Sequence, residues 1–249
     1  MSLARAEYLK LHRRRGLLAG SIALTIGPVL AAFAVLTILH SGNPAKHMPA
    51  GGAENLAAML DVLTVLAGVT AILIGTTAGA ADVGSGVFRD LVATGRSRTA
   101  LFAARIPGGL ALVLGAYAVA ALGSVVLAGS LPAPGPGTLV RFGAWILLAA
   151  TFSYVLALGV ASLLGSRGTT IGILLGWQLA MAPVLVQIRG LGSLRTGVDA
   201  AALQRIEPDA IATAAAAVPM SGLAAVAVLV VWTGLALGAG VWRTATRDA

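Results

Sequence analysis

The sequence predicts an all-α, polytopic membrane protein whose chain crosses the bilayer six times. Of its 249 residues, 58% are hydrophobic and only 10% are charged, a balance that a water-soluble domain of this size could not cover with polar surface. The hydrophobic residues also occur in long runs rather than in amphipathic periods, and about 20 apolar residues are what a helix needs to cross the hydrocarbon core. We therefore expect one membrane domain over residues 1–249.

Six apolar runs approach or exceed the length of a membrane span, and we expect one helix for each. The expected spans are residues 17–39, 56–81, 106–127, 142–164, 170–188 and 220–241. The first run follows a basic tract, as in a signal peptide, but it is too long for one and has no convincing small-residue cleavage site. We therefore expect it to be a retained anchor.

Residues 1–16 should form a cytoplasmic helix with an imperfect apolar side. Its apolar side chains share one side, but Glu7 falls among them. The segment is a basic anchor that touches anionic lipid, and it either has this role alone or also contacts a soluble partner.

Orientation follows from the Lys and Arg residues between the spans, which are retained on the cytoplasmic side. One alternating set of segments holds 12 of the 17 basic residues: Arg5, Lys10, Arg13, Arg14, Arg15, Arg89, Arg96, Arg98, Arg105, Arg167, Arg243 and Arg247. The other set holds five: Lys46, Arg141, Arg189, Arg195 and Arg205. We expect both termini in the cytoplasm, and this topology explains the net charge of +8 better than nucleic-acid binding does. The bacterial inner membrane is the expected location.

The longest outer segment covers residues 189–218. Asp209 follows Pro208 and precedes an alanine-rich stretch, so we expect a short helix there. Two placements stay open, because the segment can lie on the outer surface or dip inward as a lid over the sixth span. On the other side, Gly165 and its neighbours predict a tight hairpin between the fourth and fifth spans.

The loop between the second and third spans contains a short amphipathic helix at 87–93. Its apolar residues fall on one face, Gly95 is a natural stop, Ser97 can cap the next helix, and Arg89 and Asp90 face water. Such a helix suits either a groove in a soluble partner or the lipid headgroups.

This loop resembles the first cytoplasmic loop of type 2 ABC exporter permeases. The positions that match the family are Asp82, Gly86, Arg89, Leu91, Gly95, Ser97, Arg98 and Arg105. The chain departs from the family in having Asp where Glu is commoner, Val87 where Thr is common, and a final Arg where Lys is common. The basic N-terminal helix, the six spans and the long outer segment extend the resemblance over the whole chain.

The resemblance implies that helix 87–93 couples the permease to a separate ABC ATPase. The implied coupling residues are Asp82, Gly86, Val87, Phe88, Arg89, Leu91, Val92, Gly95, Ser97 and Arg98. The chain has no G-x-x-x-x-G-K-[ST] phosphate loop, so we expect no catalysis and no cofactor here, with ATP and Mg bound by two ATPase copies. The resemblance also implies a homodimer, or a heterodimer with a related permease.

Three residues inside the spans are candidates for a translocation path. Asp61 in the second span lines an outward-facing cavity, pairs with an outer arginine such as Arg141 or Arg189, or reaches interfacial water. We expect it to be the only clear ionisable residue in a span. Trp177 and Gln178 in the fifth span either line the path or pack and bond between helices. Glycine pairs at four-residue spacing recur, and we expect them mainly to pack helices within one chain.

Other functions fit the sequence less well. A secondary transporter should have several buried ionisable residues or related repeats. A membrane-embedded metalloenzyme should have a His-Glu-x-x-His motif, which is absent, and no metal site is expected. An accessory or immunity membrane protein without transport stays open. For the exporter, the expected cargo is amphipathic or hydrophobic, such as a drug, antibiotic, lipid or peptide.

Overall fold

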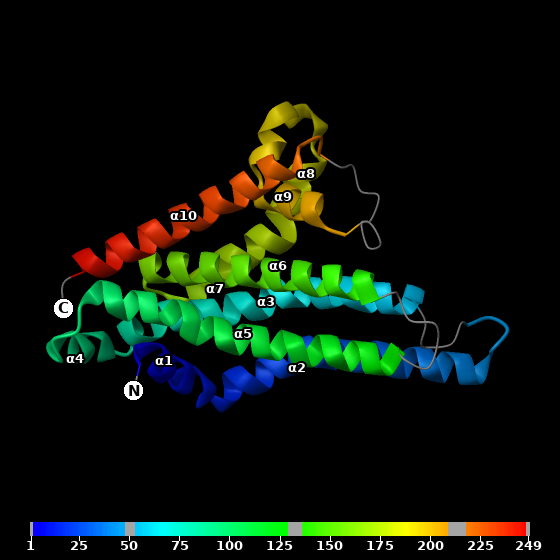
Figure 1. The fold of residues 1–249 in the computed structure, drawn as a ribbon, viewed down its shortest axis with the longest axis horizontal. Coiled ribbons are helices and arrows are strands. Elements are labelled where there is room, and N and C mark those ends of the chain that lie inside the picture. The colour runs from blue at the N-terminus through cyan, green and yellow to red at the C-terminus, as the bar shows by residue number, and fades with distance from the viewer. Residues whose placement is uncertain (1, 48–52, 129–135, 209–217, 248–249) are drawn as a thin grey trace.

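The computed structural model describes residues 2–47, 53–128, 136–208 and 218–247, and nearly all of them are helical (Figure 1). Six helices are long and apolar enough to cross a membrane, counting Arg167–Gln187 as one continuous helix, which confirms the predicted number of spans. No strand occurs within these described ranges. The helices are α1 Leu3–His12, α2 Arg15–Gly42, α3 Ala53–Gly84, α4 Val87–Ala93, α5 Arg98–Ala128, α6 Pro136–Leu164, α7 Arg167–Gly176, α8 Ala182–Gln187, α9 Asp199–Ile206 and α10 Gly222–Thr246.

Glycines and serines set the helix ends at one end of the bundle. Gly86 and Gly95 adopt left-handed backbone angles, with φ of 76° and 79°, and so separate α4 from α3 and α5. The side chain of Ser97 accepts a hydrogen bond from the Ala100 amide and caps α5, as the sequence predicts. Gly165, with φ of 70°, makes the expected tight turn between α6 and α7.

Both termini and α4 lie at the same end of the bundle (Figure 1). Helices α3 and α6 pack against each other and are mostly buried, whereas α2, α7 with α8, and α10 expose most of their surface. This distribution places the tightest packing in the centre and leaves three helices for lipid or for other chains.

The packing prediction for glycine holds for α3 and fails for α7. A Cβ at Gly75 would lie 2.6 Å from the Tyr154 carbonyl oxygen, and one at Gly79 would lie 2.7 Å from Cβ of Ala161, so these glycines let α3 and α6 touch. The Gly168, Gly172 and Gly176 positions, by contrast, face open space, as do Gly16, Gly20, Gly234 and Gly238. The α7 glycines are therefore not used for packing within the described chain.

The start of the third span and the outer segment differ from what the sequence predicts. Helix α5 begins at Arg98 rather than near residue 106, so Arg105 is a buried residue of the helix and not a loop residue. The hydropathy pattern misplaced it because a charge in a helix normally marks the end of a span. In the outer segment, α9 folds inward against α8 and α10, and the helix expected after Asp209 lies outside the described residues.

Candidate functional site

Four charged side chains from three helices meet at the end of the bundle that carries α4 and the termini. Glu7 and Lys10 come from α1, Asp82 from α3 and Arg105 from α5, and we call them the charge cluster. The Lys10 Nζ donates to both Asp82 oxygens, at 2.8 and 3.1 Å, and Nη2 of Arg105 donates to Oδ2 at 3.0 Å. Asp82 thus accepts from two cations and ties the three helices together.

The Asp82–Arg105 pair is shielded from solvent. Asp82 is 3% exposed and Arg105 only 1%. Nη1 of Arg105 also donates to the Gly79 carbonyl at 3.3 Å. The backbone carbonyl of Arg105 accepts a 2.6 Å hydrogen bond from the Tyr154 hydroxyl of α6. Buried charges are tolerated when they are paired and hydrogen-bonded in this way. The network consequently connects α6 to the three helices of the charge cluster.

Close helix approach explains how α1 reaches the charge cluster. A Cβ at Gly108 of α5 would lie 2.7 Å from Cβ of Glu7 and 2.9 Å from the Ala4 carbonyl, so only glycine allows α1 to pack there. Glu7, which interrupts the apolar side of α1, is buried and pairs with Lys10. Glu7 lies among the apolar residues of α1 because that side of the helix packs against α5.

Helix α4 is anchored on one side and open on the other. Phe88 is 3% exposed and buries its ring, whereas Val87 is 42% exposed and Arg89 and Asp90 face solvent. Phe88 therefore packs inward in the isolated chain, and its role in coupling stays a prediction. Only one side of this seven-residue helix faces the bundle, and the Phe88 ring lies on that side.

The ten predicted coupling residues divide by position. Gly86, Gly95 and Ser97 form helix ends, Asp82 lies in the charge cluster, and Nη1 of Arg98 donates to the Ala245 and Arg247 carbonyls at the end of α10. Leu91 and Val92 are half-buried. The residues left on the open surface of α4 for a partner are Val87 and Arg89, together with Asp90.

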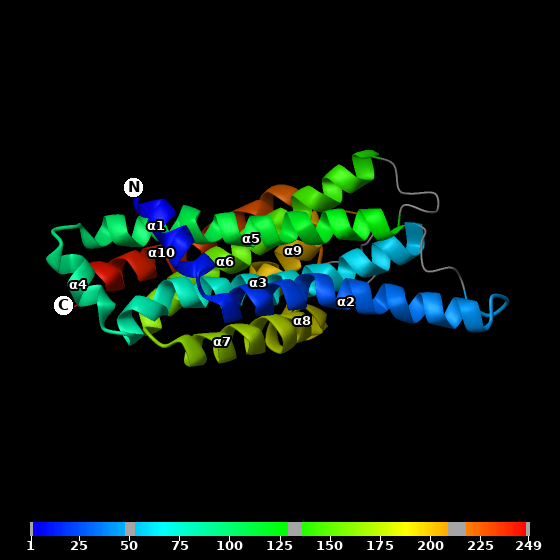
Figure 2. The ribbon, with the colours of Figure 1, turned by 90° about the horizontal axis from the view of Figure 1, so that it is seen from below.

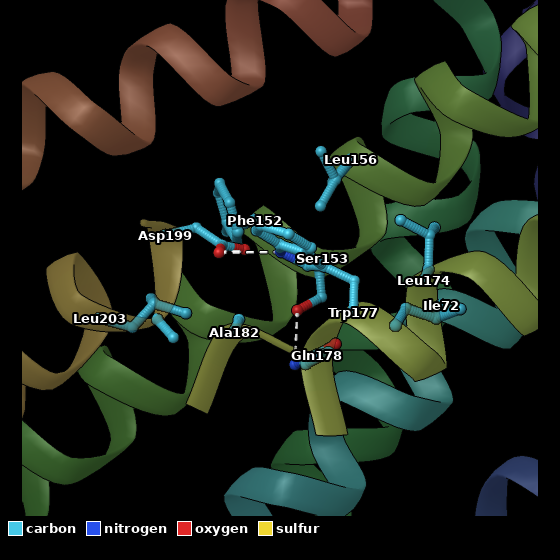
Figure 3. Close-up of a pocket in the computed structure, with 11 residues that line it drawn as sticks. Ile72, Phe152, Ser153, Leu156, Leu174, Trp177, Gln178, Ala182, Asp199 and Leu203 are labelled. Atoms are coloured by element: carbon cyan, nitrogen blue, oxygen red, sulfur yellow. Dashed lines mark hydrogen bonds between the residues drawn. The ribbon is translucent and has the colours of Figure 1, made fainter. Parts of the chain in front are cut away.

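A second polar group joins helices further along the bundle (Figure 3). Nε1 of Trp177 donates to Oδ1 of Asp199 at 3.0 Å, and Nε2 of Gln178 lies 3.5 Å from Oγ of Ser153. The Trp177 ring also packs on Trp232 of α10, with centroids 5.6 Å apart. These side chains bond and pack between helices, which is the second of the two roles that the sequence left open.

The cavity beside this group is small, about 30 Å³. Its lining includes Ser153, Trp177, Gln178 and Asp199 among apolar side chains (Figure 3). Such a volume holds about one water molecule, whereas ligand pockets measure about 300–1,000 Å³. In this conformation the two predicted path residues therefore do not line an open path.

A π-helical turn, Trp177–Met181, separates α7 from α8. The Ala182 amide donates to the Trp177 carbonyl, five residues back. Pro183 follows directly, and a proline ring clashes with the carbonyl four residues before it in a regular helix. The widened turn relieves this clash and rotates Trp177 and Gln178 relative to α8.

Sequence reasoning missed several buried ionisable residues. Asp82 and Arg105 lie inside candidate spans, and Asp199 of α9 is buried beside Trp177, so the expectation that Asp61 is the only one was wrong. Burial raises the pKa of Asp199, and the hydrogen bond from Trp177 partly offsets that rise. Asp61 belongs to α3, but its side chain lies outside the described part of the structure.

Fold and sites together define an all-helical protein with six helices long and apolar enough to cross a membrane. No known family model matches the sequence, and no curated protein is significantly similar to it. No group of three or more His, Cys, Asp or Glu residues that could hold a metal ion occurs among the described residues.

Proposed function

We propose that the chain is the membrane-spanning subunit of an ATP-driven exporter of the type 2 ABC kind. It moves an amphipathic or hydrophobic substrate, such as a drug, antibiotic, lipid or peptide, out of the cytoplasm. A separate ATPase, present in two copies, binds ATP and Mg and supplies the energy. Two permease chains, identical or related, complete the transport pathway.

The observation that carries this proposal is the connection between α4 and the charge cluster. Helix α4 follows α3 after a two-residue break, and Phe88 anchors it while Val87 and Arg89 stay on the surface. Asp82, near the end of α3, is bonded to α1 and α5. A displacement of α4 by a bound ATPase would therefore be passed to three helices at once through short, charge-assisted bonds.

The distribution of basic residues supports a cytoplasmic location for α4. Without Arg105, which is buried, 11 basic residues still belong to the set of segments at this end of the bundle, against five in the other set. Positive residues are retained on the cytoplasmic side. The surface of α4 is then available to a cytoplasmic ATPase.

The size of the cavity supports a pathway between two chains. About 30 Å³ beside Trp177 and Gln178 is too small for a drug-sized molecule. The mostly exposed helices α2, α7 with α8, and α10 offer surface for a second chain. We therefore place the translocation path at the seam between two permeases rather than through the cavity beside Trp177 and Gln178.

The secondary-transporter alternative gains little from the buried charges. Asp82 pairs with both Arg105 and Lys10, an arrangement that holds helices together instead of leaving a site for a coupling ion. Asp199 lines a cavity with room for about one water molecule. An accessory or immunity protein without transport stays a candidate that the same experiment separates from the exporter.

The test is purification of the tagged chain from its native membrane, followed by assays of nucleotide hydrolysis and identification of bound proteins. We expect a phosphate-loop ATPase to co-purify, with ATP turnover that a substrate stimulates. Val87→Asp and Arg89→Glu should lower recovery of the ATPase without lowering the amount of permease in the membrane. Lys46→Glu, an exposed charge reversal in the other set of segments, is the matched control. ATPase recovery with Val87→Asp and Arg89→Glu that equals recovery with the unchanged chain would remove the docking assignment.

A further inference from the structure

Helices α2 and α7 lie along the same side of α3 (Figure 2). Residues of all three helices and Arg14 line a groove of about 370 Å³. Gly16, Leu17 and Gly20 of α2 form one wall, and Leu73 and Thr77 of α3 contribute to the lining. This volume lies within the range of small-molecule sites. The groove is thus large enough for part of a ligand.

Two arginines, one at the start of α2 and one at the start of α7, face this groove. Arg14 precedes α2 and Arg167 begins α7, and both are exposed. No hydrogen bond or ion pair joins either guanidinium to another residue in the described part of the chain, and none of the residues that line the groove is acidic. The groove therefore has two uncompensated positive charges.

Both arginines lie where a span begins. The candidate spans start at Arg15 and at Arg167, which places the two guanidiniums at the level of the lipid headgroups. Two helices begin here, and the positive ends of their dipoles add to the cationic potential. An anion at this depth belongs to the membrane interface.

The rest of the groove is apolar and open. A Cβ at Gly16 or Gly20 would meet nothing within 4 Å, so these residues leave free space instead of packing on a neighbour. Leu17 and Leu73 provide apolar surface, and the Thr77 hydroxyl is already bonded to the Leu73 carbonyl at 2.7 Å. A ligand that fits both parts has an anionic group at one end and a hydrocarbon chain at the other.

We propose that this groove binds an anionic phospholipid. The phosphate lies between Arg14 and Arg167, and an acyl chain follows Gly16, Gly20 and Leu73 of the groove. Planar guanidinium groups suit phosphate oxygens because they donate in a fixed fork geometry. The inference concerns a lipid ligand of the isolated chain and does not depend on the proposed ATPase.

A second copy of the chain is a poorer occupant than a lipid. In a two-fold contact centred on the groove, the same surface would face itself. Arg14 and Arg167 would then approach their own counterparts, and like charges across an interface disfavour association. A lipid phosphate instead neutralises them.

Native mass spectrometry of the purified full-length protein tests the proposal, with phosphatidylglycerol and phosphatidylcholine as probes in separate titrations. We expect preferential binding of phosphatidylglycerol. The double variant R14Q/R167Q should weaken its affinity about 30-fold, the effect of two cations near an anionic lipid, and leave phosphatidylcholine binding unchanged. R14K/R167K should keep most of the affinity. R13Q/R96Q removes the same charge from exposed positions outside the groove lining and is the matched control.

Four results would overturn the proposal. Equal affinity for the two lipids, or an equal loss in R13Q/R96Q, would reduce the effect to nonspecific attraction. Saturation by inorganic phosphate that displaces no phosphatidylglycerol would show a free-anion site. Gly20→Leu fills the groove without an internal clash, so it should weaken phosphatidylglycerol binding; dissociation of a dimer by this variant, with lipid binding unchanged, would assign the groove to a second copy.

Discussion

Removal of the Asp82 charge should destabilise the protein more than any other conservative change in the charge cluster. In Asp82→Asn the side chain keeps its shape but no longer neutralises Arg105, which is 1% exposed and cannot turn to solvent. Lys10, whose side chain is 28% exposed, keeps Glu7 as a partner. The penalty therefore falls mainly on Arg105.

The expected loss of unfolding free energy is about 3 kcal/mol, at the lower end of the cost of breaking a buried ion pair, because Arg105 keeps its bond to the Gly79 carbonyl. For a chain of this size that loss corresponds to a decrease in Tm of about 10 °C. Thermal unfolding in detergent, followed by tryptophan fluorescence, measures it. Asp90→Asn, on the exposed surface of α4, should change Tm by about 2 °C or less.

A double replacement distinguishes loss of pairing from loss of packing. Asp82→Leu with Arg105→Met removes both charges and keeps apolar volume, so it should be more stable than Asp82→Asn alone. Two single replacements whose effects simply add, or an Asp82→Asn variant with the Tm of the unchanged protein, would refute the buried pair as the element that ties α3 to α5.

Three further predictions concern packing, pH and α4. Gly75→Ala should lower Tm because its Cβ would lie 2.6 Å from a carbonyl of α6, whereas Gly172→Ala, in open space, should leave Tm equal or slightly higher. The raised pKa of Asp199 means that the folded state holds its proton to higher pH than the unfolded state, so stability should fall as pH rises above about 4 and through the folded pKa. Tm measured against pH should show this fall, and Asp199→Asn should flatten it. Phe88→Ala should release α4 and speed its amide hydrogen exchange, whereas the exposed Val87→Ala should not.

The number of spans and several helix ends could be predicted from local sequence. Apolar runs of bilayer length predicted six spans, and all six have a helix. Gly95 and Gly165 predicted breaks, because glycine adopts the left-handed angles that end a helix. These features depend on neighbouring residues alone.

The charge cluster could not be predicted in the same way. Asp82 and Arg105 are 23 positions apart, and their contact depends on how α3 and α5 pack. The charge of Arg105 also made the predicted start of the third span too late. The only local sign that α1 packs into the charge cluster was Glu7 among its apolar residues. That sign is informative only once a partner such as Lys10 is known. Pro183 was a usable signal for the irregular turn after α7.

The surface of α4 is central to the proposed function, and the natural absence of cysteine allows one label to test it. A single cysteine in Arg89→Cys should react with a membrane-impermeant maleimide in inverted membrane vesicles and not in intact cells. Within those vesicles the bound ATPase should protect it, and removal of the ATPase should restore labelling. Reaction in intact cells, or labelling that is equal with and without the ATPase, would contradict a cytoplasmic α4 that docks the motor.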